Sequence, residues 1–400
     1  MTNAEKALQL HEEWNGKFET TPKMKIQTRE DLALAYTPGV AEPCKVIAKD
    51  KEAAYKYTIK SNTIAVVSDG SAVLGLGNIG AHAAMPVMEG KAVLFKEFGN
   101  VNAVPVCLDT QDTEEIIKTV VNIAPAFGGI NLEDISAPRC FEIETRLKEL
   151  LDIPVFHDDQ HGTAIAALAA LLGALKVTGK KIDEIKVVMN GAGAAGTAIA
   201  RLLLEDGVKP ENMTILNSKG ILYDNGKRDR VQLELIHKTN PENKQGTFAE
   251  AVKGADVLIG CSAPGVFNND AIKTMADKSI VFAMANPVPE IMEEEAKEKG
   301  VYIYGSGRSD MHNQVNNSSV FPGLFRGALD VRARQINEEM KLAAAHALAD
   351  LATKCQLDPD HVVVDVFDER VPHEVAKAVA KAAIASGVAR VTELPEQYKD

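Results

Sequence analysis

Apolar residues occur in short runs along most of the chain, and longer amphipathic stretches separate these runs. The short runs, rich in β-branched residues, predict strands, and the stretches between them, such as residues 114–123, have the period of helices. Alternation of this kind favours a mainly parallel sheet covered by helices. The expected strands are 63–67, 93–95, 104–108, 129–132 and 155–156, then 186–189, 214–216, 257–259, 280–283 and 301–303.

One stretch connects the two groups of strands. The run 153–156 stops near two adjacent carboxylates, Asp158 and Asp159, and an Ala- and Leu-rich segment over 163–178 then predicts a buried helix. We therefore expect an α/β protein of two domains that meet near this helix, with a helical segment from Leu324 onward. The predicted parts are 1–165, 166–320 and 321–400.

Composition narrows the class of protein. Of the 400 residues 25% are charged, and the net charge of −12 argues against a nucleic-acid or anionic-membrane surface. The five cysteines are widely spaced with no CxxC pair, which favours reduced thiols in the cytoplasm. The polar N-terminus lacks a signal-peptide core, and the apolar run 162–175 is shorter than the roughly 20 residues of a membrane span. We expect a cytoplasmic protein that binds neither nucleic acid nor membrane.

A glycine-rich turn follows the strand expected at 186–189. Gly191, Gly193 and Gly196 lie between that strand and a helical run from Thr197, which is the context that a dinucleotide-binding GxGxxG motif needs. The first glycine makes the tight turn, the second lets the pyrophosphate approach, and the third packs helix on strand. The second domain is therefore expected to be a Rossmann-type domain that binds NAD or NADP.

The cofactor ribose is expected at the end of the next strand, where Rossmann domains commonly carry an acidic residue. Here that position is Asn217, which can hydrogen-bond a ribose hydroxyl but has no charge to repel a 2′-phosphate. Lys219 is nearby. The sequence permits NADP as well as NAD and does not decide between them.

A second GxGxxG pattern occurs earlier, at Gly75, Gly77 and Gly80. Residues 69–71 separate it from the preceding strand, and Pro86 interrupts the helix that follows. We expect a structural turn or an anion site for the substrate there, rather than a second dinucleotide site.

Carboxylates end two expected strands of the first domain, as Glu133-Asp134 and Asp158-Asp159. Ligands bind at the carboxyl ends of parallel strands, and converging carboxylates suit a hard cation such as Mg²⁺ or Mn²⁺. The alternative is that each pair is a solvated strand end. Two histidines flank the second pair, but zinc is disfavoured because the pair lies at a strand–helix junction and lacks the glutamate of HExxH.

Lys91 and Tyr36 are candidate acid–base residues. Lys91 lies between a glycine-rich turn and the apolar run 93–95, and a lysine in such a setting can lose its proton and act as a base. Tyr36 lies within a turn signal over 35–40. The simpler alternatives are a surface lysine and a packing tyrosine.

Together these segments closely resemble the malic enzyme family in its compact bacterial form. The matches follow the family's order from residue 36 to 323, and in combination they are highly specific. They are YTPGVA from Tyr36, SDG from Ser68 followed by LGLGNIG, GKAVLF around Lys91, NLEDI around Glu133 and Asp134, FHDDQHGTA around Asp159, GAGAAG from Gly191, ANP at Asn286 and NNSSVFPG around Asn317.

The resemblance implies oxidative decarboxylation of L-malate to pyruvate and CO₂, with NAD or NADP reduced and Mg²⁺ or Mn²⁺ required. The first domain would then be catalytic, with Lys91 as general base, supported by Asp158, and Tyr36 as general acid. The implied metal ligands are Glu133, Asp134 and Asp159; the cofactor contacts are Gly191, Gly193, Ala194, Ala195, Gly196, Asn217, Ser262 and Asn286; the substrate contacts are Ser71, Asn286 and Asn317.

One segment departs from the family. Larger malic enzymes carry a substrate-binding arginine just before LGLG, whereas residues 71–73 here read Ser-Ala-Val. Ser71 and the amides after Gly77 are the expected replacement. The resemblance also implies that part of the tail packs back on the first domain. Helical, fairly apolar termini indicate a homodimer, in which Tyr36 serves its own subunit or its neighbour.

Other functions fit parts of the pattern. The uncharged Asn217 allows a metal-dependent oxaloacetate decarboxylase with a vestigial cofactor site. A non-catalytic metabolite sensor is disfavoured because Tyr36, Lys91 and the carboxylates are all present. An amino-acid dehydrogenase also has two α/β domains and a glycine-flanked lysine, but it needs no metal, so EDTA would leave its activity intact.

Overall fold

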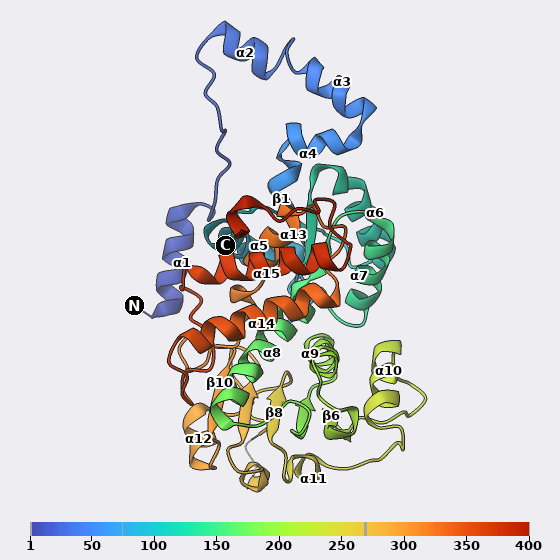
Figure 1. Cartoon of the computed structure of the whole chain (residues 1–400), viewed down its shortest axis with the longest axis vertical. Coiled ribbons are helices and arrows are strands. Elements are labelled where there is room, and N and C mark those ends of the chain that lie inside the picture. The colour runs from blue at the N-terminus through green and yellow to red at the C-terminus, as the bar shows by residue number, and fades with distance from the viewer. Residues whose placement is uncertain (1, 74, 268–269, 400) are drawn as a thin grey trace.

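The computed structural model describes residues 2–73, 75–267 and 270–399 and holds two sheets, in different halves of the molecule (Figure 1). Leu74, in the first glycine-rich segment, lies outside the described residues. The first sheet has four parallel strands in the order β2-β1-β3-β4, joined by three helices. Their bounds are β1 Thr63–Ser68, α5 Gly80–Gly99, β2 Asn102–Cys107, α6 Thr113–Ile123, β3 Gly129–Leu132, α7 Arg139–Leu150 and β4 Val155–His157.

The second sheet has the order β10-β9-β8-β5-β6-β7, with β7 antiparallel to β6 and the other pairs parallel. Its central strands are buried along their whole length, as parallel strands covered on both faces are. The predicted α/β class is confirmed. The bounds are β5 Val187–Asn190, α9 Ala194–Glu205, β6 Met213–Asn217, β7 Gly220–Ile221, α10 Arg230–Thr239, α11 Phe248–Val252, β8 Val257–Gly260, β9 Ile280–Ala283, α12 Glu293–Glu298 and β10 Ile303–Ser306.

One predicted strand is wrong, and one is displaced. Residues 93–95 belong to α5, so Lys91 lies within a helix, and Pro86 is accommodated inside that helix without ending it. The Val-Leu-Phe run is apolar enough for either structure, and so few residues show no decisive period. The strand predicted at 301–303 begins at Ile303. The buried positions of α5 recur at helical spacing: Ala81, Ala84, Met88, Lys91, Ala92, Phe95 and Gly99.

Helix α8 (Asp158–Thr178) forms the centre of the core, packed against α9 and α14 (Glu338–Lys354). Among the described residues it is the one helix long and apolar enough to cross a membrane, but most of it is buried inside the protein. Helices α13 (Phe321–Asp330) and α15 (Arg370–Ala385) follow the short helix η6 (Asn317–Ser319), and α13 packs on α5. The predicted boundaries between the parts of the chain stay predictions.

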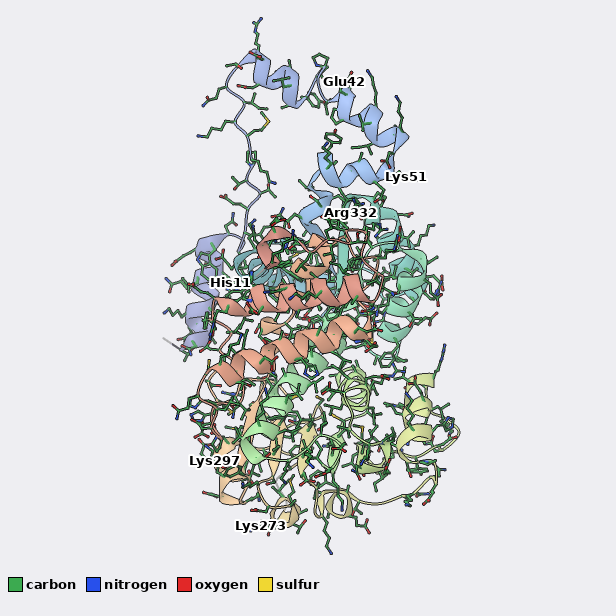
Figure 2. The ribbon with its side chains drawn as sticks, viewed as in Figure 1. His11, Glu42, Lys51, Lys273, Lys297 and Arg332 are labelled. Atoms are coloured by element: carbon green, nitrogen blue, oxygen red, sulfur yellow. The ribbon has the colours of Figure 1, made fainter. Side chains whose placement is uncertain are left out.

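An arm over residues 18–58 extends from the first domain. Helices α2 and α3 stand away from the rest of the chain (Figure 1) and have no buried residues. Glu42 lies on the outer part of the arm, whereas Lys51 lies near its base, close to Arg332 (Figure 2). An ion pair between Arg332 and Glu52 ties the base to the body. The N-terminal helices are α1 Asn3–Trp14, α2 Arg29–Ala35, α3 Ala41–Lys49 and α4 Ala54–Tyr57.

Candidate active site

Three carboxylates meet at the carboxyl edge of the first sheet. One oxygen each from Glu133, Asp134 and Asp159 lie within 4.8 Å of one another. Strands β3 and β4 are paired with Leu132 opposite His157, so the residues after each strand leave the sheet at the same place. The parallel register therefore brings together acids that are distant in the sequence.

The backbone of Asp134 fixes this arrangement. Its φ of 54° lies in the left-handed region and turns the chain directly after β3. Its N–H donates to Asp159 Oδ2 at 2.7 Å, and its carbonyl accepts the N–H of Ala72 at 2.9 Å. The acidic turn is thereby joined to the start of α8 and to the loop after β1.

Lys91 reaches the carboxylates from α5. Its ammonium lies 2.8 Å from Glu133 Oε1 and forms a second ion pair with Asp158. The centroid of the Phe321 ring lies 4.1 Å from the ammonium, a cation–π contact. Because Lys91, Glu133 and Asp158 are all buried, this lysine is not a surface charge.

Burial and like charges shift the pKa values in this cluster. Burial, with Asp159 and Glu133 adding to it, raises the pKa of Asp134 to about 9. Burial also raises the pKa of Glu133, and that of Asp158 to about 7, although Lys91 opposes both shifts. Burial alone would lower the pKa of Lys91, but the Asp158 and Glu133 carboxylates more than offset this and raise it. The carboxyl groups in this cluster outnumber its one cationic side chain, Lys91.

The donor set fits a hard divalent cation. Asp134 Oδ2 and Asp158 Oδ1 are buried, and no described group hydrogen-bonds to either. Carboxylate oxygens are the ligands that Mg²⁺ and Mn²⁺ prefer. A cation there would pair the orphaned oxygens and offset the repulsion among the acids. Ligation by Glu133, Asp134 and Asp159 stays a prediction.

Asp158 connects Lys91 to the polypeptide after the second sheet. Its Oδ2 accepts a hydrogen bond from Asn317 Nδ2 at 2.7 Å, and Asn317 begins the short helix η6 (Asn317–Ser319). One turn further along α8, a Cβ on Gly162 would collide with the Asp158 carboxylate. The glycine of the HDDQHG segment is therefore required for Asp158 and Asn317 to meet.

The second glycine motif forms the turn from β5 into α9 with the geometry expected. Gly191 has a φ of 126°, and a Cβ on it would lie 2.5 Å from a carbonyl oxygen just after β8. No described atom lies within 4 Å of the Cβ position of Gly193, which leaves room for a phosphate, whereas a Cβ on Gly196 would collide with Gly191. Ala194 and Ala195 begin α9, whose first N–H groups suit an anion.

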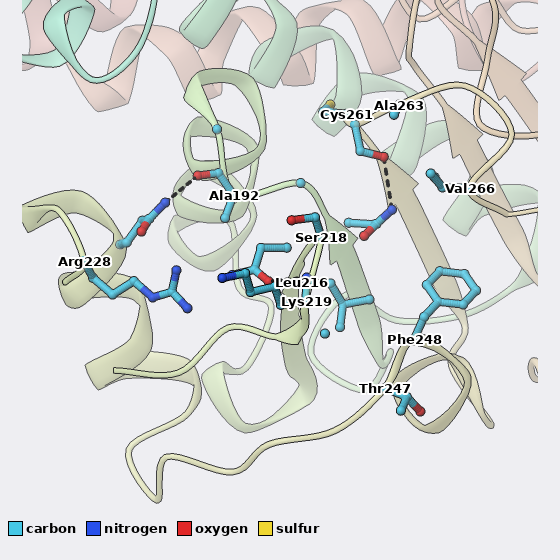
Figure 3. Close-up of a pocket in the computed structure, with 17 residues that line it drawn as sticks. Ala192, Leu216, Ser218, Lys219, Arg228, Thr247, Phe248, Cys261, Ala263 and Val266 are labelled. Carbon is cyan, nitrogen blue, oxygen red and sulfur yellow. Dashed lines mark hydrogen bonds between the residues drawn. The ribbon is translucent and has the colours of Figure 1, made fainter. Parts of the chain in front are cut away.

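A cavity of about 700 Å³ opens beside this turn (Figure 3). It is lined by the glycine turn, by Ser262 just after β8 and by Asn217 at the end of β6. The N–H of Ser262 donates to Glu290 at 2.8 Å, and its hydroxyl accepts from Asn190 at 3.1 Å. Four of the eight predicted cofactor residues therefore line one pocket: Gly191, Gly193, Asn217 and Ser262.

Comparisons with known proteins cover nearly the whole chain. Residues 15–148 match the family described as "Malic enzyme, N-terminal domain", and residues 160–384 match "Malic enzyme, NAD binding domain". This chain belongs to the malic enzyme family. The NAD-dependent malic enzyme of Geobacillus stearothermophilus is 56% identical over 95% of this chain and 79% of that relative.

Two further malic enzymes span the chain almost from end to end. The bifunctional malic/malolactic enzyme of Bacillus subtilis (strain 168) is 54% identical over 100% of this chain and 98% of its own length. The crystal structure of malic enzyme from Pyrococcus horikoshii Ot3 has a TM-score of 0.93 and 51% identity, covering 98% of this chain and 92% of that one. The similarity therefore includes both sheets and the C-terminal helices.

In this malic enzyme, Asn286 lies where the two sheets' loops touch. A Cβ on Gly75 would lie 2.6 Å from Pro287 Cδ and 3.3 Å from the carbonyl oxygen of Asn286. Gly75 and Gly77 have φ values of 71° and 74°. The first glycine motif forms a tight turn, as expected, and its lack of side chains allows this close approach.

Ser71 is held by Arg139, a residue that our sequence-based prediction missed. The Ser71 hydroxyl donates to Asp69 at 2.5 Å and accepts from Arg139 Nη2 and the Ser136 N–H, both at 2.9 Å. Arg139 also pairs with Asp69 at 2.8 Å. A substrate bond from Ser71 Oγ would require one of these contacts to break. Arg139 supplies a guanidinium next to the segment where larger malic enzymes have their arginine.

The histidines beside the acidic pair lie next to other groups. Among the described residues, neither is in a group that could hold a metal. His161 Nε2 lies 2.9 Å from the buried Glu144, which also accepts from Lys148 at 2.7 Å and from the His157 N–H at 3.3 Å. Burial would raise the pKa of Glu144, but His161 and Lys148 hold it well below the usual value. Glu144 anchors the turn that carries Asp158.

Tyr36 is the predicted catalytic residue that a single chain does not bring to Lys91. It follows α2 directly and is 68% exposed. Figure 1 shows α2 at the end of the arm, far from α5. The other predicted residues of the first domain gather at the edge of the first sheet.

Proposed function

We propose that this malic enzyme converts L-malate to pyruvate and CO₂, reduces NAD⁺ or NADP⁺, and requires Mg²⁺ or Mn²⁺. The observation that carries the proposal is the burial of Lys91 against Glu133 and Asp158, beside further carboxylates at the ligand-binding edge of a parallel sheet. The open cofactor cavity of about 700 Å³ counts against a decarboxylase with a vestigial dinucleotide site.

Lys91 is the general base in this proposal. It takes the proton of the malate C2 hydroxyl while the hydride on C2 moves to the nicotinamide. Asp158 orients Lys91, and Asn317 in turn orients Asp158. A base must be deprotonated, and the neighbouring carboxylates raise the pKa of Lys91, so their negative charge has to be offset before the reaction.

Glu133, Asp134 and Asp159 would hold the divalent cation. When bound, it supplies the positive charge that offsets these acids and an electrophile for the developing charge on the substrate C2 oxygen. The chain's own contribution is to hold the carboxylates within 4.8 Å of one another in a buried site. Loss of CO₂ from the oxidised substrate then leaves an enolate, which Tyr36 protonates at C3.

We further propose a homodimer in which Tyr36 enters the partner's active site. Leu34 and Tyr36 are 69% and 68% exposed on the arm, and Ile26 is 56% exposed. Exposed apolar side chains on a segment that stands away from the body are typical of an interface. A second copy of this chain suits the arm, because Tyr36, the proposed general acid, directly follows α2 and lies away from the Lys91 site of its own chain. The cytoplasm is the proposed location, consistent with five free cysteines.

An assay with L-malate and Mn²⁺, run in parallel with NAD⁺ and NADP⁺, tests the proposed reaction. We expect one reduced nicotinamide and one pyruvate per malate, and no reaction after EDTA treatment. Decarboxylation of oxaloacetate without any malate-dependent reduction would contradict the proposal and favour a lyase.

A further inference from the structure

Two basic residues, Lys219 and Arg228, line part of the cofactor pocket. We propose that Lys219 and Arg228 bind the 2′-phosphate of NADP⁺, so that the enzyme uses NADP⁺ in preference to NAD⁺. This inference rests on the proposed function, since it selects the cofactor of that reaction.

These residues lie where a Rossmann domain places the adenosine ribose. The pocket is lined by Gly193 of the phosphate-binding turn and also by Lys219 and Arg228, beyond the end of β6. Ribose hydroxyls are recognised at that strand end. Figure 3 shows Arg228 and Lys219 toward one side of the pocket, with Val266 and Phe248 toward the other. A phosphate on the ribose 2′-oxygen would therefore lie near the two cations.

Neither cation has a counter-ion within the described chain. The residues that line the pocket include no aspartate or glutamate, and no described carboxylate forms an ion pair with Lys219 or Arg228. On the adjoining helices, by contrast, Arg201 and Lys238 both pair with Glu234. In a chain of net charge −12, two unpaired cations in one pocket indicate an anionic ligand.

The two aspartates near Arg228 in the sequence, Asp224 and Asp229, accept hydrogen bonds from backbone groups. Asp224 accepts the N–H of Gly226 at 2.8 Å, and Asp229 caps α10 by accepting the N–H of Gln232 at 2.9 Å. Both carboxylates stabilise backbone N–H groups of their own segment. They therefore leave the charge of Arg228 available to a ligand.

Local hydrogen bonds present donors rather than acceptors to the ribose. Arg228 Nε donates to the Tyr223 carbonyl at 3.0 Å, which fixes the side chain and leaves its terminal nitrogens available. Asn217 Oδ1 accepts the N–H of Lys219 at 2.8 Å, so Asn217 has its amide N–H groups to offer. A phosphate only accepts hydrogen bonds, whereas a 2′-hydroxyl pairs best with a carboxylate acceptor. The donor set favours NADP⁺.

Titration calorimetry of the full-length protein with 2′,5′-ADP and with 5′-AMP tests this subsite apart from the reaction. We expect 2′,5′-ADP to bind about tenfold to hundredfold more tightly, as charged hydrogen bonds of this kind would give. Arg228→Gln should remove most of that difference and leave 5′-AMP binding unchanged, which also shows that the variant is folded. Lys227→Gln removes the same charge at an exposed neighbour that does not line the pocket, and it should change neither affinity.

Equal affinity of the wild type for the two nucleotides would overturn the inference, and so would malate oxidation that uses NAD⁺ but not NADP⁺. In the second case the proposed function would stand. If 2′,5′-ADP binds tightly but neither cofactor supports malate oxidation, the phosphate subsite would stand and the proposed reaction would be wrong. An Arg228→Gln variant with unchanged discrimination would exclude Arg228 from the subsite.

Discussion

The ammonium of Lys91 lies 2.8 Å from Glu133 Oε1, and each of these side chains is only 7% exposed. Removing both charges from water is unfavourable, and such a pair adds little to stability when compared with apolar packing. Asp134 and Asp158, which lie beside it, have buried oxygens without hydrogen-bond partners among the described residues. Buried charged groups that add little to the stability of the fold and have shifted pKa values are typical of a functional site.

Lys91→Ala should lower kcat for malate oxidation by about 10²-fold to 10⁴-fold, because the general base is lost. Cofactor affinity should be unchanged, since the glycine turn belongs to the second sheet. Steady-state kinetics and cofactor titration separate the two effects. Lys96→Ala, at an exposed position on the same helix, is the matched control and should keep its activity. Parallel loss of cofactor binding in Lys91→Ala would show that the assigned role is wrong.

Asp159→Asn should raise the dissociation constant for Mn²⁺ by at least about tenfold, because one anionic ligand of the cation is lost. Electron paramagnetic resonance measures free Mn²⁺ during a titration of the purified protein. Glu149→Gln, an exposed acid on α7, is the control and should leave the curve in place. An Asp159→Asn curve that coincides with that of the wild type would exclude Asp159 as a ligand.

Asp134 gives the metal-free protein a specific pH dependence. Its pKa rises from 3.8 to about 9 on folding, so the folded chain keeps a proton that the unfolded chain loses. Its contribution to stability is present below about pH 4 and is lost as the pH rises toward about 9. Asp134→Asn should therefore melt at a higher temperature than the wild type at pH 8, and the gap should shrink at pH 5. Melting curves in EDTA that show no widening of this gap with pH would contradict the account.

Hybrid dimers test where Tyr36 acts. Tyr36→Phe and Lys91→Ala subunits should each have little activity alone. Co-expression with two affinity tags gives a hybrid in which one site combines an intact Tyr36 with an intact Lys91, and we expect about half of the wild-type activity. If each tyrosine serves its own subunit, both sites of the hybrid are defective and the hybrid stays inactive.

Local sequence was sufficient to place several of the strands and one of the turns. Strands β3 and β9 have the predicted bounds, and the turn at Gly191 has the predicted form. The convergence of Glu133 and Asp159 also followed from strand order, because parallel strands deliver their ends to one edge. The helix around Lys91 was missed because Pro86 and a short apolar run hid its period.

Contacts between distant segments could not be predicted in this way. Arg139 binds Ser71 across 68 positions, and nothing in either segment signals the pairing. The buried contact between Glu144 and His161 could not be predicted either, because a glutamate in an amphipathic helix is normally expected on the solvent-exposed face. The position of Tyr36 on the arm depends on how that arm leaves the body, which local propensity does not specify.

The most direct test of the account is anomalous diffraction at the manganese edge from crystals soaked in Mn²⁺. We predict one strong peak within about 2.5 Å of oxygens from Glu133, Asp134 and Asp159, with Lys91 alongside. A peak at some other site, with these oxygens unliganded in a protein that is active with Mn²⁺, would contradict the central claim.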